Sequence, residues 1–90
     1  GVQMPLLSTV TPGTKFTIRN LSANHNLYMN THPSDANQNF VIKWSTASPQ
    51  VKSSPWAIGD SKRVIELFAY RTGSEGSYNY RWITVEIDTN

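Results

Sequence analysis

Few side chains of this 90-residue chain could carry out acid–base or metal chemistry, and they are scattered. Two histidines, His25 and His32, lie in one polar segment, and further metal ligands would have to come from Asp35 or from a second copy of the chain. Solvated loop histidines are therefore favoured over a metal site. Glu66 and Glu86 fall within expected strands and could pair as acid and base. Carboxylates that face outward or bond a neighbouring Arg are the commoner case.

No nucleophile motif accompanies these groups. The chain has no Gly-Xaa-Ser-Xaa-Gly elbow and no phosphate-binding loop, and without cysteine it has no Cys–His pair or thiolate metal site. Its many serines stand in turn-forming segments, where hydroxyl groups cap and bend the backbone. The sequence predicts that the protein is not an enzyme and that it uses no metal or cofactor.

Aromatic residues are the more prominent feature: three Trp, four Tyr and three Phe, set among Asn, Ser and Thr. Trp and Tyr combine a flat apolar face with a polar tip, which suits both protein interfaces and stacking against sugars. Alternation within FVIKWS places Trp44 in the core together with Phe40 and Ile42.

The stretch YNYRWITVEI, residues 78–87, is apolar on both faces of a strand. With a period of two, one face carries Ile83, Val85 and Ile87, and the other carries Tyr78, Tyr80 and Trp82. We assign the aliphatic face to the core, which leaves the aromatic face to be covered by a subunit or a ligand.

The preceding expected strand, KRVIELFAY at residues 62–70, is also apolar on both faces, and a monomer seldom leaves such a patch bare. We therefore expect a symmetric homo-oligomer, which would also compensate for a small core. Trp82 is expected at the subunit interface. Tyr78 and Tyr80 lie nearer the hairpin sequence RTGSEGS, and both an interface role and a ligand contact stay open for them.

The elements that must position these side chains are all strands, since short runs bounded by turn residues recur and no segment has helical periodicity. The expected strands are residues 2–10, 14–20, 27–29, 40–45, 56–58, 62–70 and 78–87. No connection is long enough for a crossover helix, so most pairs should be antiparallel. The predicted fold is all-β: a small antiparallel sandwich or barrel of about six to seven strands, forming a single domain over residues 1–90.

Two long polar segments separate these strands: THPSDANQN, residues 31–39, and STASPQVKSSP, residues 45–55. They are too polar to pack and too long for simple connectors, and rigid scaffolds usually carry recognition residues on such loops. Shortening either loop is expected to abolish binding and leave the melting temperature nearly unchanged. The side chains expected to bond sugar hydroxyls are Asp35, Asn37, Gln38 and Asn39.

Charge and hydropathy exclude two classes of partner. The net charge is +2 and the basic residues are scattered, which is no electrostatic footprint for nucleic acid. No apolar run approaches the roughly 18 residues of a membrane span, and the N-terminus lacks a signal-peptide layout, so we expect no membrane insertion. Because the chain starts Gly-Val-Gln without methionine, we expect it to be a fragment of a longer protein.

Several stretches resemble a known family. The succession TPGTKFTIRNLS, NHNLYMNT, IGDSKRVIELFAY and YRWITVEI is similar to the C-terminal domains of phage tail fibres and tailspikes. The similarity covers residues 12–20, 24–30, 59–67 and 82–83, and the two long loops depart from the family pattern.

The resemblance implies a homotrimeric knob at the tip of a tail fibre, extracellular on the virion, at the C-terminal end of a longer fibre protein. Its function would be receptor binding, by attachment to a bacterial surface polysaccharide or lipopolysaccharide. Two alternatives stay open. One is a monomeric carbohydrate-binding module with Tyr78, Tyr80 and Trp82 as an exposed platform. The other is a purely structural fibre or capsid domain.

Overall fold

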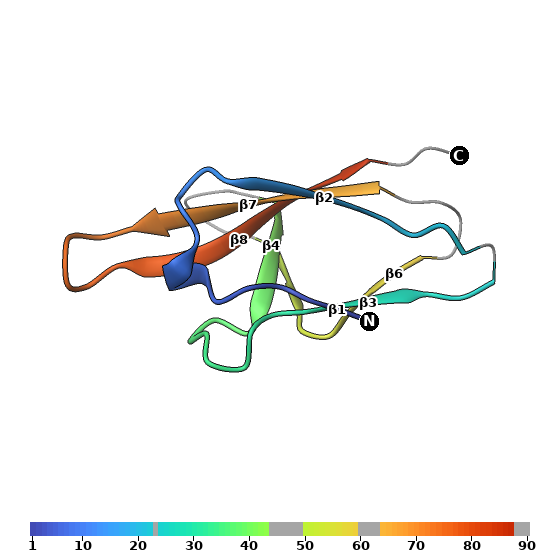
Figure 1. Ribbon diagram of the computed structural model, residues 1–90, viewed down its shortest axis with the longest axis horizontal. Helices are drawn as coiled ribbons and strands as arrows, with labels where there is room; N and C mark the ends of the chain where they lie inside the picture. The colour runs from blue at the N-terminus through green and yellow to red at the C-terminus, as the bar shows by residue number, and fades with distance from the viewer. Residues whose placement is uncertain (23, 44–49, 60–63, 88–90) are drawn as a thin grey trace.

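Two mixed β-sheets pack face to face in the computed structural model of the chain (Figure 1). The structure describes residues 1–22, 24–43, 50–59 and 64–87. Its elements are the strands β1 (Val2–Gln3), β2 (Lys15–Arg19), β3 (Leu27–Asn30), β4 (Asn39–Lys43), β5 (Gln50–Ser53), β6 (Trp56–Ile58), β7 (Val64–Thr72) and β8 (Asn79–Ile87), and the short 3₁₀ helix η1 (Leu7–Thr9). The all-β sandwich expected from the sequence is confirmed.

The three-stranded sheet has the order β1-β3-β6, and the five-stranded sheet has the order β2-β7-β8-β4-β5. Most neighbours are antiparallel, but β1 is parallel to β3 and β4 is parallel to β8. Parallel neighbours need a long crossover. Here the crossover passes through the opposite sheet, by way of β2 in one case and β6 in the other, so no helix is required.

Two expected elements differ in the structure. The strand expected over residues 2–10 ends at Gln3, and η1 follows shortly after Pro5, which cannot donate a ladder hydrogen bond. Four residues of the loop expected over residues 45–55 form the edge strand β5, which raises the number of strands in the described residues to eight. All four residues of β5 are exposed. This strand is therefore held by its backbone pairing with β4, and it has no apolar alternation that could reveal it.

The turn at Thr11-Pro12-Gly13 and the alternation of the next strand are as expected. Thr14 N–H donates to the Thr11 carbonyl at 3.0 Å, and Gly13 has a φ of 89°. Phe16 and Ile18 then pack against the core from β2. Proline and glycine suit the two central positions of such a turn, so this segment follows from local chemistry.

The core lies between the two sheets. The three-stranded sheet and the segment before β2 contribute one set of buried side chains, and the five-stranded sheet contributes the other. The buried core residues are Met4, Leu7, Met29, Phe40, Trp56, Ile58, Ile65, Leu67, Ala69 and Trp82. Ile42 packs against this cluster as expected. Trp44, which was expected beside it, lies outside the described residues.

The structure reverses the expected faces of β8. Trp82 is 0% exposed in the core and Tyr80 packs against it, whereas Val85 is 50% exposed. Strand register gives the reason, because Trp82 lies opposite Ala69 of β7, whose small side chain leaves room for the indole. Ile83 is also buried, but on the other face of the sheet. The second sheet of the same chain therefore covers Trp82. The side chain of Ile87, expected beside Ile83 and Val85, lies outside the described part.

Candidate functional site

The β7–β8 hairpin extends beyond the core and forms one end of the molecule's long axis (Figure 1). Its strands stay paired as far as Thr72 and Asn79. The turn that follows requires glycine at Gly73, where φ is 94° and a Cβ atom would lie 2.6 Å from the Ser77 carbonyl oxygen. The hairpin therefore carries the core-facing side of its strands out into solvent.

Three side chains gather on that projecting face. The rings of Tyr78 and Tyr80 meet edge to face, with centroids 6.0 Å apart and an interplanar angle of 69°. The guanidinium carbon of Arg71 lies 4.0 Å from the centroid of the Tyr78 ring. Arg71 pairs with Tyr80 across the two strands, and it is exposed while both tyrosines are half-buried. The pair and the cation form a small aromatic surface with one positive charge.

The loop over residues 31–39 reaches β8 through two asparagines. Asn37 Nδ2 donates to Asn79 Oδ1 and to the Tyr80 carbonyl, each at 2.8 Å. Asn39 Oδ1 accepts from Arg81 Nη1 at 3.2 Å. The Tyr80 carbonyl lies just before the point where β4 begins to pair with β8, so Asn37 bonds the strand where β4 does not yet pair with it. Two segments that are distant in the sequence thereby meet.

We call this group of residues the hairpin site. It consists of Arg71, Tyr78 and Tyr80, with the Asn37 side chain bonded to the Tyr80 carbonyl at the strand edge. The sequence indicated Asn37, Tyr78 and Tyr80 but missed Arg71. The local sequence carries no signal for this partner, because a turn centred in RTGSEGS would pair Arg71 with Ser77 and not with Tyr80.

The other two predicted loop residues hold the loop itself together. Gln38 Nε2 donates to the His32 and Asp35 carbonyls at 2.8 and 2.6 Å, and its Oε1 accepts from Thr31 Oγ1 at 2.8 Å. The Asp35 carboxylate accepts from the Leu7 N–H at 3.3 and 3.4 Å. These polar atoms have internal partners, so binding sugar would require them to exchange those bonds.

Burial raises the pKa of the Asp35 carboxyl above its ordinary value of 3.8, and this effect outweighs two weaker ones of opposite sign. Those are the hydrogen bond from Leu7 and the nearby charge of His32, each of which favours the ionised form. The ionised carboxylate therefore costs the folded protein some stability at neutral pH.

The histidines do not belong to a metal-binding cluster in the described part of the chain. His25 is exposed, and His32 Nδ1 accepts from the Ser34 N–H at 3.0 Å. Among the described residues no three His, Asp or Glu side chains are grouped so that they could hold a metal ion.

One of the two carboxylates considered as an acid–base pair has a different partner. Glu66 lies 3.8 Å from Lys15 Nζ on β2, in an ion pair at the surface, and the Glu86 side chain lies outside the described part.

Comparison of the chain with protein-family models, with curated proteins and with solved structures finds no match. No helix in the described residues is long and apolar enough to cross a membrane.

Proposed function

We propose that this chain is a receptor-binding domain of a phage tail fibre, which attaches to a bacterial surface glycan through the hairpin site. The observation that carries the proposal is the hydrogen bonding of Asn37 to Asn79 and to the Tyr80 backbone, which joins a recognition loop to an aromatic strand. The resemblance in the turn and strand sequences supplies the phage context.

The chemistry of the hairpin site suits a saccharide. The rings of Tyr78 and Tyr80 can contact the C–H face of a sugar, and the Asn37 amide, held at the Tyr80 carbonyl, can bond one of its hydroxyl groups. Asn37 Oδ1 is bonded by no described residue, so this acceptor remains for a ligand. Trp82 has no part in this surface, because it is buried inside the chain.

A monomeric carbohydrate-binding module is the second candidate, and the reversed faces of β8 favour it. Trp82 on the aromatic face no longer needs a partner subunit, because it is buried in the core between the two sheets. The homotrimer then depends on the opposite face, where Val41, Ile83 and Phe68 lie in register across β4, β8 and β7. Val51 continues this row on β5 and is 44% exposed.

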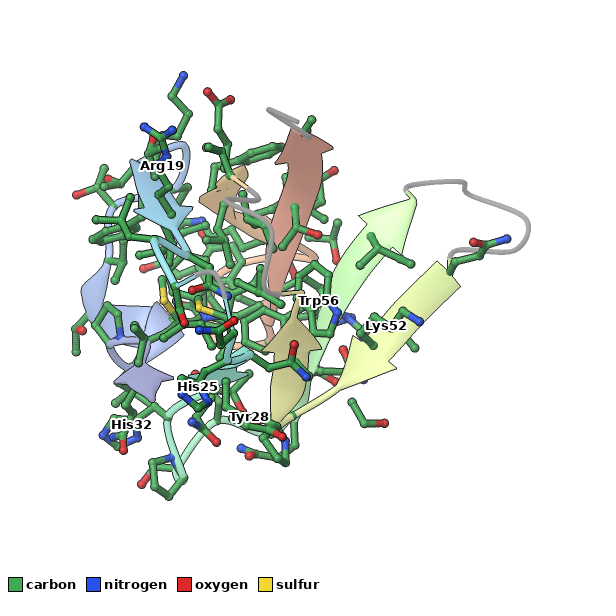
Figure 2. All side chains as sticks on the ribbon, turned by 90° about the vertical axis from the view of Figure 1, so that its right-hand side faces the viewer. Arg19, His25, Tyr28, His32, Lys52 and Trp56 are labelled. Atoms are coloured by element: carbon green, nitrogen blue, oxygen red, sulfur yellow. The ribbon has the colours of Figure 1, made fainter. Side chains whose placement is uncertain are left out.

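The test is binding of the chain to an array of bacterial surface polysaccharides, with Tyr78→Ala against the control Tyr28→Ala. Tyr28 is 49% exposed on β3, and Figure 2 shows it in a view from the end opposite the hairpin tip. We expect Tyr78→Ala to bind at least about tenfold more weakly, because aromatic contacts dominate such surfaces. The control should bind normally.

Two results would contradict the proposal: no binding of any glycan by the unmodified chain, or equal binding by both tyrosine variants. Melting temperatures of the variants, measured alongside, show whether a loss of binding reflects unfolding.

A further inference from the structure

The position of Arg71 in the hairpin site indicates a narrower class of ligand than sugars in general. Its guanidinium group stacks on the Tyr78 ring at 4.0 Å, although the residue as a whole is exposed. Stacking uses the flat face of the guanidinium group and leaves its N–H donors directed outward in the plane. An arginine held in this way is partly ordered before a ligand arrives, which lowers the entropic cost of binding.

The described residues provide no carboxylate partner for this cation. The ion pair between Lys15 and Glu66 is the one found among them, and the Asp35 carboxylate is bonded to Leu7. Glu75 belongs to the hairpin turn and is exposed, but it forms no ion pair with Arg71. The charge of Arg71 is therefore not neutralised by the described part of the protein.

Arg71 also changes what a ligand meets at the tyrosines. Because the guanidinium group covers one face of Tyr78, a sugar can contact only the remaining surface of the two rings. A planar anion attached to that sugar could bond the guanidinium edge in a two-point arrangement, which is the strong geometry for arginine with a carboxylate. A neutral sugar would leave this charged group without a matching partner.

We infer that the ligand of the hairpin site is an acidic saccharide whose carboxylate is bound by Arg71, beside the rings of Tyr78 and Tyr80. This inference rests on the proposed function and narrows its ligand from glycans in general to those that contain uronic or other sugar acids. Arg71 is then the residue that determines specificity, and the tyrosines supply contact area.

The experiment uses pairs of uronate-containing bacterial polysaccharides, each in its native form and in a form whose carboxyl groups have been reduced to alcohols. Binding of the unmodified chain is compared with binding of Arg71→Gln and Arg71→Lys. Lys52→Gln is the control, because it removes the same charge from β5, on the β4–β5 hairpin that projects from the body in Figure 2.

We expect the unmodified chain and Lys52→Gln to bind a native polysaccharide roughly ten- to a hundredfold more tightly than its reduced form. Arg71→Gln should lose this preference, and Arg71→Lys should keep only part of it, because lysine retains the charge but not the planar fork. The lysine variant also serves as the readout if the glutamine variant folds poorly.

Three results would overturn the inference. Two of them are equal binding of native and reduced polysaccharides, and an undiminished preference of Arg71→Gln for the native form. Either would contradict an acidic ligand bound by Arg71 without contradicting glycan binding. The third is failure of the unmodified chain to bind any glycan, which would contradict the proposed function as well.

Discussion

At the scale of single residues, the side chain that decides most about this fold is Trp82. It lies opposite Ala69, pairs with Phe40 on the neighbouring parallel strand, and meets the Phe16 ring edge to face at 5.7 Å. Its indole N–H is buried with no hydrogen-bond partner in the described residues. An unpaired buried donor costs about 1–3 kcal/mol, so the packing of the ring must outweigh that loss.

Truncation should separate this buried aromatic residue from the half-buried Tyr78. We expect Trp82→Ala to lower the free energy of unfolding by about 3–5 kcal/mol, because it leaves a cavity in the core. Tyr78→Ala should cost less than about 1 kcal/mol, since its ring lies at the hairpin surface. Urea denaturation followed by circular dichroism measures both. A Trp82→Ala protein as stable as the unmodified chain would contradict the assignment of this face to the core.

The pH dependence of stability should change when Asp35 is replaced by Asn. A carboxyl whose pKa is raised on folding stabilises the protein fully below its unfolded value of 3.8, and this contribution is lost as the pH rises through the folded-state pKa. Asn can still accept the Leu7 N–H but has no charge to bury. Relative to the unmodified chain, Asp35→Asn should therefore become more favourable on going from about pH 3 to about pH 7.

Thermal melts of both proteins at several pH values give this comparison. A stability difference that does not vary with pH, or one that varies with the opposite sign, would show that burial does not dominate at Asp35.

At the scale of elements, the loop over residues 31–39 is part of the structure as well as a candidate for recognition. Gln38 bonds three loop residues, and the Gln38 carbonyl accepts from the Ser54 N–H at 2.9 Å. Asn20 has a similar role at the other end of the sandwich. It is buried, and its amide donates to the carbonyls of His25 and Gly59 at 2.9 and 2.7 Å. Polar side chains thus order loops that have few apolar contacts.

These hydrogen bonds predict that the loop contributes to the stability of the protein. Gln38→Ala should lower the free energy of unfolding by about 1–2 kcal/mol, because it removes several hydrogen bonds within the loop. Gln3→Ala is the matched control, since Gln3 is exposed on β1 and its side chain bonds no described residue. Shortening the loop is accordingly expected to reduce stability, in place of the neutral effect expected from its composition. Equal melting temperatures for the two variants would instead support the expectation from composition, that the loop contributes little to stability.

At the scale of the whole molecule, the face of the five-stranded sheet that points away from the core is the surface on which a trimer would depend. Val85 is 50% exposed on this face, beside the row formed by Phe68, Ile83 and Val41. Val41 and Ile83 are buried without belonging to the cluster between the sheets. The apolar character expected for both sides of β7 and β8 is thus present, and in β8 the buried and outward sides are exchanged relative to the expectation.

Assembly should respond to charge on this face. If the homotrimer forms through it, Val85→Lys should shift sedimentation equilibrium from three times the chain mass of 10.1 kDa toward the monomer, because a buried charge without a partner is costly. Leu21→Lys is the control, as Leu21 is 72% exposed in the β2–β3 connection. An unmodified chain that sediments as a monomer at all concentrations would exclude the trimer.

Local chemistry determined much of this protein from its sequence. The Pro12-Gly13 turn, the inward Phe16 and Ile18, and the hairpin between β7 and β8 depend on residues close together in the chain. Turn residues and a period of two suffice to predict such features. The choice of Asn37 and the two tyrosines as candidate ligand contacts likewise required only that polar loops and aromatic strands carry recognition.

Tertiary structure alone decided which face of β8 is buried, that β5 exists, and that Arg71 stacks beside the tyrosines. Alternation divides the side chains of a strand into two faces, but it does not show which face is buried when both are apolar. For β8 this was decided by the register that places Trp82 beside Ala69. β5 is held by backbone bonds, which no side-chain pattern records. Asn37 and Tyr80 are 43 positions apart, and a contact over that distance depends on the strand order of the folded sheet.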